Sequence, residues 1–202
     1  MHIKRRWLIG LAVVVILMVI CHCKITPLVT ELAVTRVENQ ASDVITDAVN
    51  AQITDGTVGY DKIVILEKND SGQVTALKTD MEQANRLRQQ VLELVNQRIL
   101  ELNVYDLGIP LGNVLNPTVL SGWGPQIPVR VASVNNASAT FESRFTEAGI
   151  NQTLHQIILQ VSMDVDILIA GGTHKTTVTQ PVVVAETIIV GVVPEAFLNA
   201  EH

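Results

Sequence analysis

The chain has 202 residues, of which 48% are apolar, and it carries a formal net charge of −6. This length suits one domain of ordinary size with a hydrophobic core. The acidic balance argues against a nucleic-acid partner, because recognition of phosphates needs a basic surface.

The N-terminal segment has the pattern of a membrane anchor. Basic residues at positions 4–6 precede an apolar run from Trp7 to Cys21. A helix needs roughly 17 to 25 residues to cross a bilayer, and the stretch from Trp7 to Cys23 just reaches that range. A cleaved signal peptide is the alternative, but the exit "MVICHCKITP" offers no small residues of the kind that precede a cleavage site. We predict that residues 1–24 form a cytoplasmic basic stub and a retained transmembrane anchor, with residues 25–202 outside the cytoplasm.

The predicted exported part is strongly acidic. The first 24 residues contain four basic and no acidic residues, so the remainder holds ten basic and twenty acidic residues. Both cysteines, Cys21 and Cys23, lie at the outer end of the apolar run, and they are too close for an unstrained disulfide. We interpret them as small apolar residues, with lipidation or an intermolecular bridge as the alternative.

Two helices and a hairpin are predicted after the anchor. Apolar residues recur every three or four positions from Val34 to Ile53, which indicates an amphipathic helix. Two short apolar runs flank the turn residues at 69–72 and predict a β-hairpin. A second amphipathic stripe follows Asp80, with Gln83 placed for a capping box.

Residues 105–128 are rich in glycine and proline, which predicts loops and short strands. The "GWGP" within this segment predicts a tight turn that carries Trp123. That side chain is either part of a structural corner or an exposed contact site for a partner. The later "GGTHKT" lacks the spacing of a phosphate-binding loop and predicts a hairpin turn.

The last third of the chain is rich in β-strand signals. Alternating or β-branched stretches predict four strands at 129–134, 139–146, 153–169 and 176–192. The strand at 153–169 alternates most clearly, with His155 and the following odd-numbered residues on one apolar face and the acidic residues on the other.

His155 is the candidate for a functional histidine. A tight turn at Gly171 and Gly172 predicts that Glu186 shares the face of His155, within reach across the strands. Catalysis would need a nucleophile or a metal to complete the site, and the sequence shows neither a cysteine in the domain nor a Gly-x-Ser-x-Gly motif. We predict a structural polar pair, with a binding site and a catalytic site as alternatives, and no metal or cofactor.

Several segments together resemble a known family. They read "YDKIVILEKNDSGQVTAL", "IPLGNVL", "GWGPQIPVRV", "GINQTLH" and "AETIIVGVVPEAF". The chain is similar over nearly its whole length to the sporulation protein YunB family of endospore-forming Firmicutes. This resemblance implies a membrane-attached mother-cell protein needed for normal spore formation, and it carries over no enzymatic activity. Its motif positions are Gly149, Asn151, Gln152, Thr153 and His155, which we treat as candidate contacts.

The order of elements predicts an α+β fold, with an N-terminal transmembrane helix followed by two helices packed on a mainly antiparallel β-sheet. We expect a non-enzymatic membrane protein of the mother-cell or outer forespore membrane, whose domain associates with itself or with other sporulation membrane proteins. The alternative is an envelope enzyme or ligand sensor that uses a pocket near His155 and Glu186. A third possibility is a secreted domain released by signal cleavage.

Overall fold

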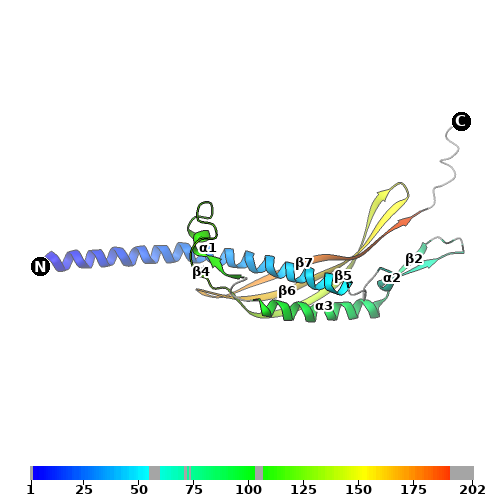
Figure 1. Ribbon diagram of the computed structural model, residues 1–202, viewed down its shortest axis with the longest axis horizontal. Helices are drawn as coiled ribbons and strands as arrows, with labels where there is room; N and C mark the ends of the chain where they lie inside the picture. Colours follow the sequence, from blue (N-terminus) through cyan, green and yellow to red (C-terminus); the bar gives the residue numbers. More distant parts are fainter. Residues whose placement is uncertain (1, 55–59, 71, 73, 103–106, 192–202) are drawn as a thin grey trace, which may run out of the picture. The chain divides into compact units, whose positions relative to one another are not determined.

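The computed structural model of the protein describes residues 2–54, 60–70, 72, 74–102 and 107–191, with side chains from residue 25 onward (Figure 1). Its helices are α1 (His2–Thr54), α2 (Tyr60–Ile63), α3 (Met81–Glu101) and α5 (Leu111–Leu115). Its strands are β1 (Val64–Lys68), β2 (Val74–Thr79), β3 (Ile109–Pro110), β4 (Gln126–Ile127), β5 (Arg130–Gly149), β6 (Gln152–Ile169) and β7 (Gly172–Val190). The protein therefore combines helices with antiparallel sheets, as the sequence predicted.

Helix α1 continues through Pro27, so the predicted anchor and the predicted amphipathic helix belong to one helix. Its buried residues recur at three- or four-residue spacing, which confirms the predicted amphipathic stripe. These residues are Val29, Ala33, Val37, Ala41, Ile45, Ala48 and Val49. In the described part of the chain, no helix is both long and apolar enough to cross a bilayer. The predicted anchor lies at residues 1–24, whose side chains are outside the described residues.

The predicted hairpin and second helix are both present. Strands β1 and β2 pair antiparallel, with Leu66 opposite Leu77. Asp80 caps α3, because its Oδ1 accepts the backbone N–H groups of Glu82 and Gln83 at 3.0 and 3.1 Å. The backbone N–H of Asp80 donates to the carbonyl of Ile63 at 2.8 Å instead of to Gln83, so the second half of the predicted capping box does not form.

The long strands form a three-stranded sheet in the order β5-β6-β7. Two-residue connections join the neighbours, so both pairs are antiparallel. The prediction of two strands separated by a turn at "NNAS" was wrong, because β5 is continuous from Arg130 to Gly149. Asn136 absorbs the irregularity with a φ of 50°, a conformation that asparagine tolerates better than most residues.

The described contacts group the chain into two compact units. Unit 1 comprises Met1–Gln40, Leu100–Ser133 and Val165–Thr176, and unit 2 comprises Ala41–Ile99, Val134–Asp164 and Thr177–His202. Helix α1 and the long strands contribute residues to both units.

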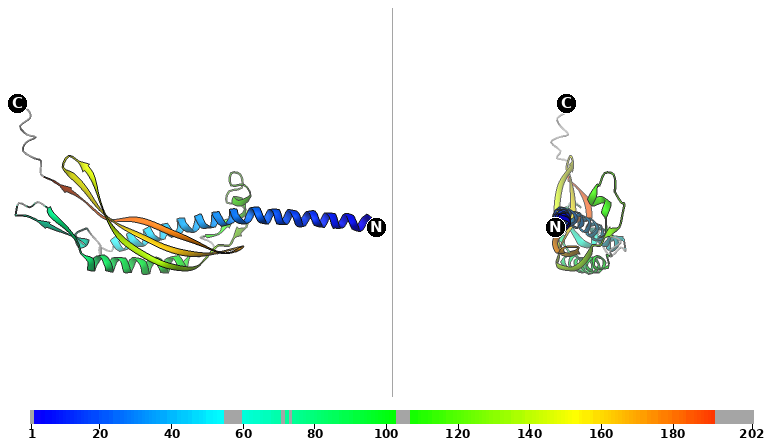
Figure 2. Two further views of the ribbon diagram at one scale, coloured as in Figure 1. Left: turned by 180° about the vertical axis from the view of Figure 1, so that it is seen from behind. Right: turned by 90° about the vertical axis from the view of Figure 1, so that its left-hand side faces the viewer.

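Each unit has its own buried residues. In unit 1, α1 and β6 bury apolar residues together with residues 107–129, which we call the Gly-Pro segment and which supply Leu107, Ile109, Val114 and Val129. In unit 2, one stripe of α1, one stripe of α3 and alternate residues of β6 are buried, and Figure 2 shows α1 and α3 running alongside the long strands. Alternate burial along β6 means that one face of the sheet is packed.

Candidate functional site

His155 lies on the packed face of β6 and is only 2% exposed. It is the one buried polar side chain among the described residues. The neighbouring inward positions Ile157, Leu159 and Val161 are apolar and buried, so the alternation correctly predicted which face the histidine occupies. A buried imidazole needs hydrogen-bond partners for its ring nitrogens.

Two hydroxyl groups provide these partners. The Tyr60 hydroxyl lies 2.7 Å from Nδ1, and the Ser143 hydroxyl lies 2.6 Å from Nε2. In a neutral imidazole one ring nitrogen donates and the other accepts, and each hydroxyl can take either role. The histidine thus links α2, β5 and β6 with both nitrogens satisfied.

Two aromatic rings enclose the imidazole. The Phe145 ring stacks on it with centroids 4.4 Å apart and an angle of 11°, and the Tyr60 ring meets it edge-on at 5.7 Å. Burial lowers the pKa of His155 and raises the pKa of the Tyr60 phenol, because removal from water disfavours each charged form. Both groups are therefore held neutral. We call Tyr60, Ser143, Phe145 and His155 the histidine clamp.

Glu186 does not join this clamp. Its Oε2 accepts a hydrogen bond of 3.0 Å from Nε2 of Gln156, which neighbours His155 along β6 and so points to the opposite face. The predicted pairing of Glu186 with His155 was therefore wrong. The cause lies in β7, where burial alternates on even-numbered residues as far as Val184 and then moves to odd-numbered ones from Ala185. That change of face turns Glu186 outward.

The motif from Gly149 to Thr153 forms the turn between β5 and β6. Gly149 and Asn151 have φ values of 143° and 56°, in the region that favours glycine and tolerates asparagine. The carbonyl of Asn151 accepts the backbone N–H of Gly191 at 2.7 Å, so the turn also ties down the end of β7. Gln152 is exposed and Thr153 is partly buried. These motif residues shape the hairpin, and only His155 among them belongs to the clamp.

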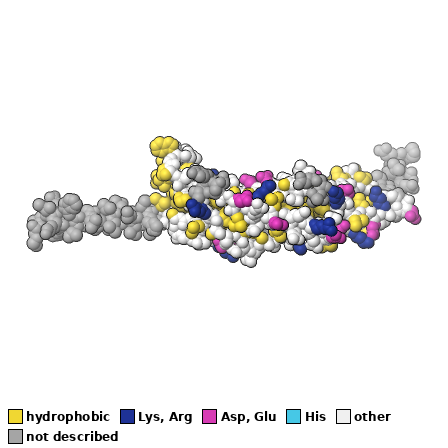
Figure 3. Space-filling view, turned by 60° about the horizontal axis from the view of Figure 1, so that its bottom comes forward, with side chains coloured by type: hydrophobic (Ala, Val, Ile, Leu, Met, Phe, Trp, Pro, Cys, Tyr) yellow, Lys and Arg dark blue, Asp and Glu magenta, His cyan; other side chains and the backbone are white. Residues whose placement is uncertain are grey.

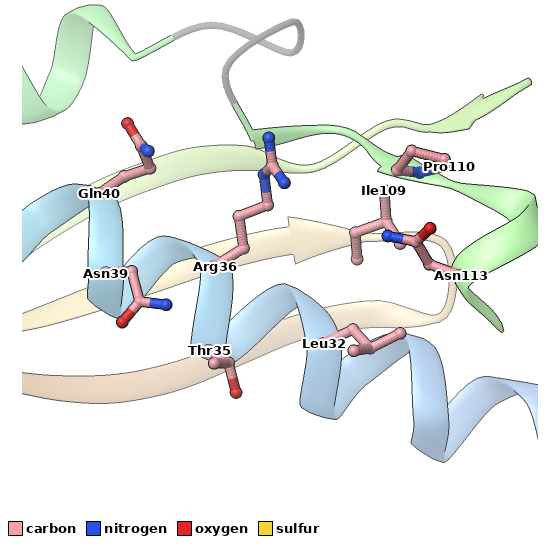
Figure 4. A pocket seen from close by; sticks show the side chains of 8 residues that line it. All are labelled: Leu32, Thr35, Arg36, Asn39, Gln40, Ile109, Pro110 and Asn113. Atoms are coloured by element: carbon pink, nitrogen blue, oxygen red, sulfur yellow. The ribbon is translucent and has the colours of Figure 1, made fainter. Parts of the chain in front are cut away.

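Trp123 lies in the Gly-Pro segment of unit 1, and its side chain is 75% exposed. A pocket of about 280 Å³ lies nearby in the same unit, between α1 and the segment that contains β3 and α5 (Figure 4). Its lining combines one cation with amide and apolar side chains: Leu32, Thr35, Arg36, Asn39, Gln40, Ile109, Pro110 and Asn113. Among the described residues, no group of three or more histidine, cysteine, aspartate or glutamate side chains could hold a metal ion.

The chemistry of the clamp is that of a weak base. Ser143 and His155 have the contact of a nucleophile and its general base, which the sequence analysis missed. A catalytic histidine, however, becomes positively charged, and the third group here is a neutral phenol instead of a carboxylate. The lowered pKa of His155 opposes that charge further. The geometry fits a structural connection better than proton transfer.

The other residues of the histidine clamp were not predicted from the sequence, for two different reasons. Ser143 and Phe145 lie on β5, which pairs with β6. The strand ends at Gly149 and Gln152 would place Thr146 opposite His155, so the turn alone would have put Ser143 and Phe145 on the other face. Tyr60 lies 95 positions away and outside the sheet, and no local pattern points to it.

Comparisons with known proteins bear on this region. Residues 106–196 match the family model described as sporulation protein YunB. The resemblance to the sporulation protein YunB family is confirmed. The chain is also similar to sporulation protein YunB of Bacillus subtilis strain 168, with 23% identity over 183 residues, which covers 86% of this chain and 72% of the relative. No solved structure matches the chain. The YunB family match contains the hairpin turn, most of the histidine clamp and Trp123.

Proposed function

We propose that this protein is a membrane-anchored sporulation protein whose extracytoplasmic domain acts by binding to a second copy or to another sporulation membrane protein. The role in sporulation follows from the similarity to the YunB family. The anchor follows from the apolar run at residues 7–21 and the basic residues before it. We place it in the mother-cell or outer forespore membrane.

The observation that carries the binding role is an exposed apolar cluster at one end of the sheet in unit 2. Ile150, Ile188 and Val190 are all exposed large apolar residues, and Ile150 and Val190 are 89% and 70% exposed. The hydrogen bond from Gly191 to Asn151 holds the end of β7 beside the β5–β6 turn, so Ile188 and Val190 lie near the turn that carries Ile150. We call these three residues the apolar tip. Contiguous exposed apolar surface marks interaction sites.

The rest of the sheet is less suited to association. In the part of the chain that the structure describes, β5 and β7 are the edge strands of the three-stranded sheet. Pro181 interrupts the hydrogen-bonding groups of β7, and Asn136 adopts a positive φ within β5. Proline and local irregularities are common means of blocking edge-to-edge pairing. A partner is therefore directed to the apolar tip.

A crosslinking pull-down of the tagged full-length protein from sporulating cells tests this function. We expect crosslinked partners or self-adducts from the wild type, and their loss in Ile150→Asp. Ile65→Asp is the matched control, because Ile65 is an exposed isoleucine of unit 2 on a different sheet. An absence of partners for the wild type, or equal partners for both variants, would contradict the proposal.

The second candidate function is an envelope enzyme that uses the Ser143 hydroxyl. The specific observation in its favour is the 2.6 Å contact between this exposed serine and Nε2 of His155. Replacement of Ser143 with alanine distinguishes the two functions. If the protein acts by binding, Ser143→Ala cells form spores at the wild-type frequency, whereas an enzyme with a serine nucleophile would lose its function while the protein stays folded.

A further inference from the structure

The Gly-Pro segment of unit 1 forms a braced loop between α5 and β4. The backbone N–H groups of Leu111 and Gly112 donate to the carbonyls of Pro125 and Trp123 at 3.0 and 2.8 Å. The side chain of Asn113 accepts the N–H of Gly122 at 2.7 Å. A Cβ on Gly112 would lie 2.0 Å from the carbonyl oxygen of Leu120, so only glycine fits there. The loop therefore has a defined conformation.

This loop presents apolar side chains to the outside. Val119 and Trp123 are 76% and 75% exposed, and Leu115 is also exposed. Leu28 of α1 and Leu168 of β6 are further exposed leucines of the same unit. We call these five residues the apolar rim. A braced loop with outward apolar side chains needs a partner that covers them.

The apolar rim lies near the part of α1 that follows the apolar run at residues 7–21. The loop that begins at Pro110 and Asn113 lines a pocket together with Leu32 and Arg36 of α1. A Cβ on Gly171, in the β6–β7 turn, would lie 3.4 Å from the side-chain methyl of Thr26. Figure 3 shows apolar side chains at the tip of the loop, next to the point where the grey N-terminal part of α1 begins.

The distance along α1 from the end of the predicted anchor to Leu28 places Leu28 near the membrane surface. Leu28 follows Cys23 by five residues, which is about 8 Å of helix at a rise of about 1.5 Å per residue. The headgroup layer on each side of a bilayer is of similar thickness, about 5 to 8 Å. Leu28 would therefore lie at the outer edge of the headgroup layer if residues 7–23 span the hydrocarbon core.

Charge supports the same occupant. The chain contains 20 acidic residues, yet the segments 25–30, 107–129 and 167–174 contain none. The braced loop at residues 107–129 therefore lacks the carboxylates that anionic phospholipid headgroups would repel, whereas Glu31 follows Leu28 by one helical turn and Asp166 shares a face of β6 with Leu168.

We propose that the apolar rim inserts into the headgroup layer of the bilayer that holds the N-terminal anchor, with Trp123 at the membrane–water interface. Tryptophan favours this depth because its ring is apolar and its indole N–H is polar. The inference rests on the membrane anchoring in the proposed function. It adds a second membrane contact, which fixes the orientation of unit 1 on the membrane.

Tryptophan fluorescence of the full-length protein in vesicles tests the proposal. The chain has two tryptophans, Trp7 and Trp123, so Trp7→Phe reports on the rim and Trp123→Phe reports on the anchor. Each variant is reconstituted in vesicles of phosphatidylcholine and phosphatidylglycerol, with and without bromine atoms on the acyl chains near the headgroups. We expect the brominated lipids to quench most of the tryptophan emission of both variants. We also expect the emission maximum of Trp123 in vesicles to lie at a shorter wavelength than that of the unfolded protein in denaturant.

The outcomes separate the rim from the anchor. Quenching of Trp7 without quenching of Trp123 would overturn the insertion of the rim and leave the anchor in place. Quenching of neither would overturn the anchor as well. A short-wavelength emission of Trp123 that bromine does not quench would show that protein covers the rim, which also overturns the proposal. In the Trp7→Phe background, Val119→Ser should reduce the quenching of Trp123.

Discussion

Removing the hydroxyl of Tyr60 tests the histidine clamp. His155 is almost fully buried, and its Nδ1 meets the Tyr60 hydroxyl at 2.7 Å. Tyr60→Phe keeps the ring and its edge contact, but it leaves a buried ring nitrogen without its partner. The expected loss in the free energy of unfolding is about 1 to 3 kcal/mol, the cost of an unsatisfied buried polar group. For a chain of this size that corresponds to a fall in Tm of roughly 2 to 4 °C per kcal/mol.

Ser143→Ala is the matched control at the other ring nitrogen. Ser143 is exposed, so water can replace its hydroxyl beside Nε2, and we expect a loss below about 1 kcal/mol. The assay is urea unfolding of the full-length protein in a mild detergent, followed by far-ultraviolet circular dichroism. A Tyr60→Phe variant as stable as the wild type, or a greater loss for Ser143→Ala, would refute the reasoning.

Three further predictions concern pH, a cap and the braced loop. Burial lowers the pKa of His155 in the folded state. The contribution of the neutral histidine to the free energy of unfolding is therefore complete above its ordinary pKa of about 6.5, and it is lost as the pH falls through that value toward the lower pKa of the folded state, by at most about 1.4 kcal/mol per pH unit. Urea midpoints between pH 5 and 7.5 should vary less for His155→Gln than for the wild type. Asp80→Ala removes the cap of α3 and should cost about 1 kcal/mol in the same unfolding assay, whereas the exposed Asp70→Ala should cost almost nothing. Gly112→Ala should open the loop that carries Trp123, seen as faster cleavage at residues 111–125 in limited proteolysis; a cleavage rate equal to that of the wild type would contradict the close contact with Leu120.

The parts of the fold that the sequence predicted well have strong local signals. The alternation in β6 predicted both the strand and the buried face of His155, because a strand with one packed face must alternate. Helix α3 has an amphipathic stripe and an aspartate cap, and each feature is encoded within a few residues. Such signals need no knowledge of distant partners.

The errors arose where a local signal was overridden by tertiary structure. "NNAS" has the residues of a turn, but Asn136 adopts its positive φ inside a continuous strand and its side chain donates to Asp164 on β6 at 2.7 Å. The register of β7 could not be extended from its turn, because the buried face changes after Val184. Tyr60 reaches His155 from another element, which only the folded chain reveals.

Site-specific crosslinking at the apolar tip tests the central proposal most directly. With Cys21 and Cys23 replaced by serine, Ile150→Cys gives a single thiol at the most exposed apolar position of the described residues. Asp70→Cys, at the exposed β1–β2 turn, is the control. A short thiol-reactive crosslinker applied to sporulating cells should join the protein to a partner or to a second copy through residue 150 and not through residue 70. An absence of adducts at residue 150, or equal adducts at both positions, would contradict the account.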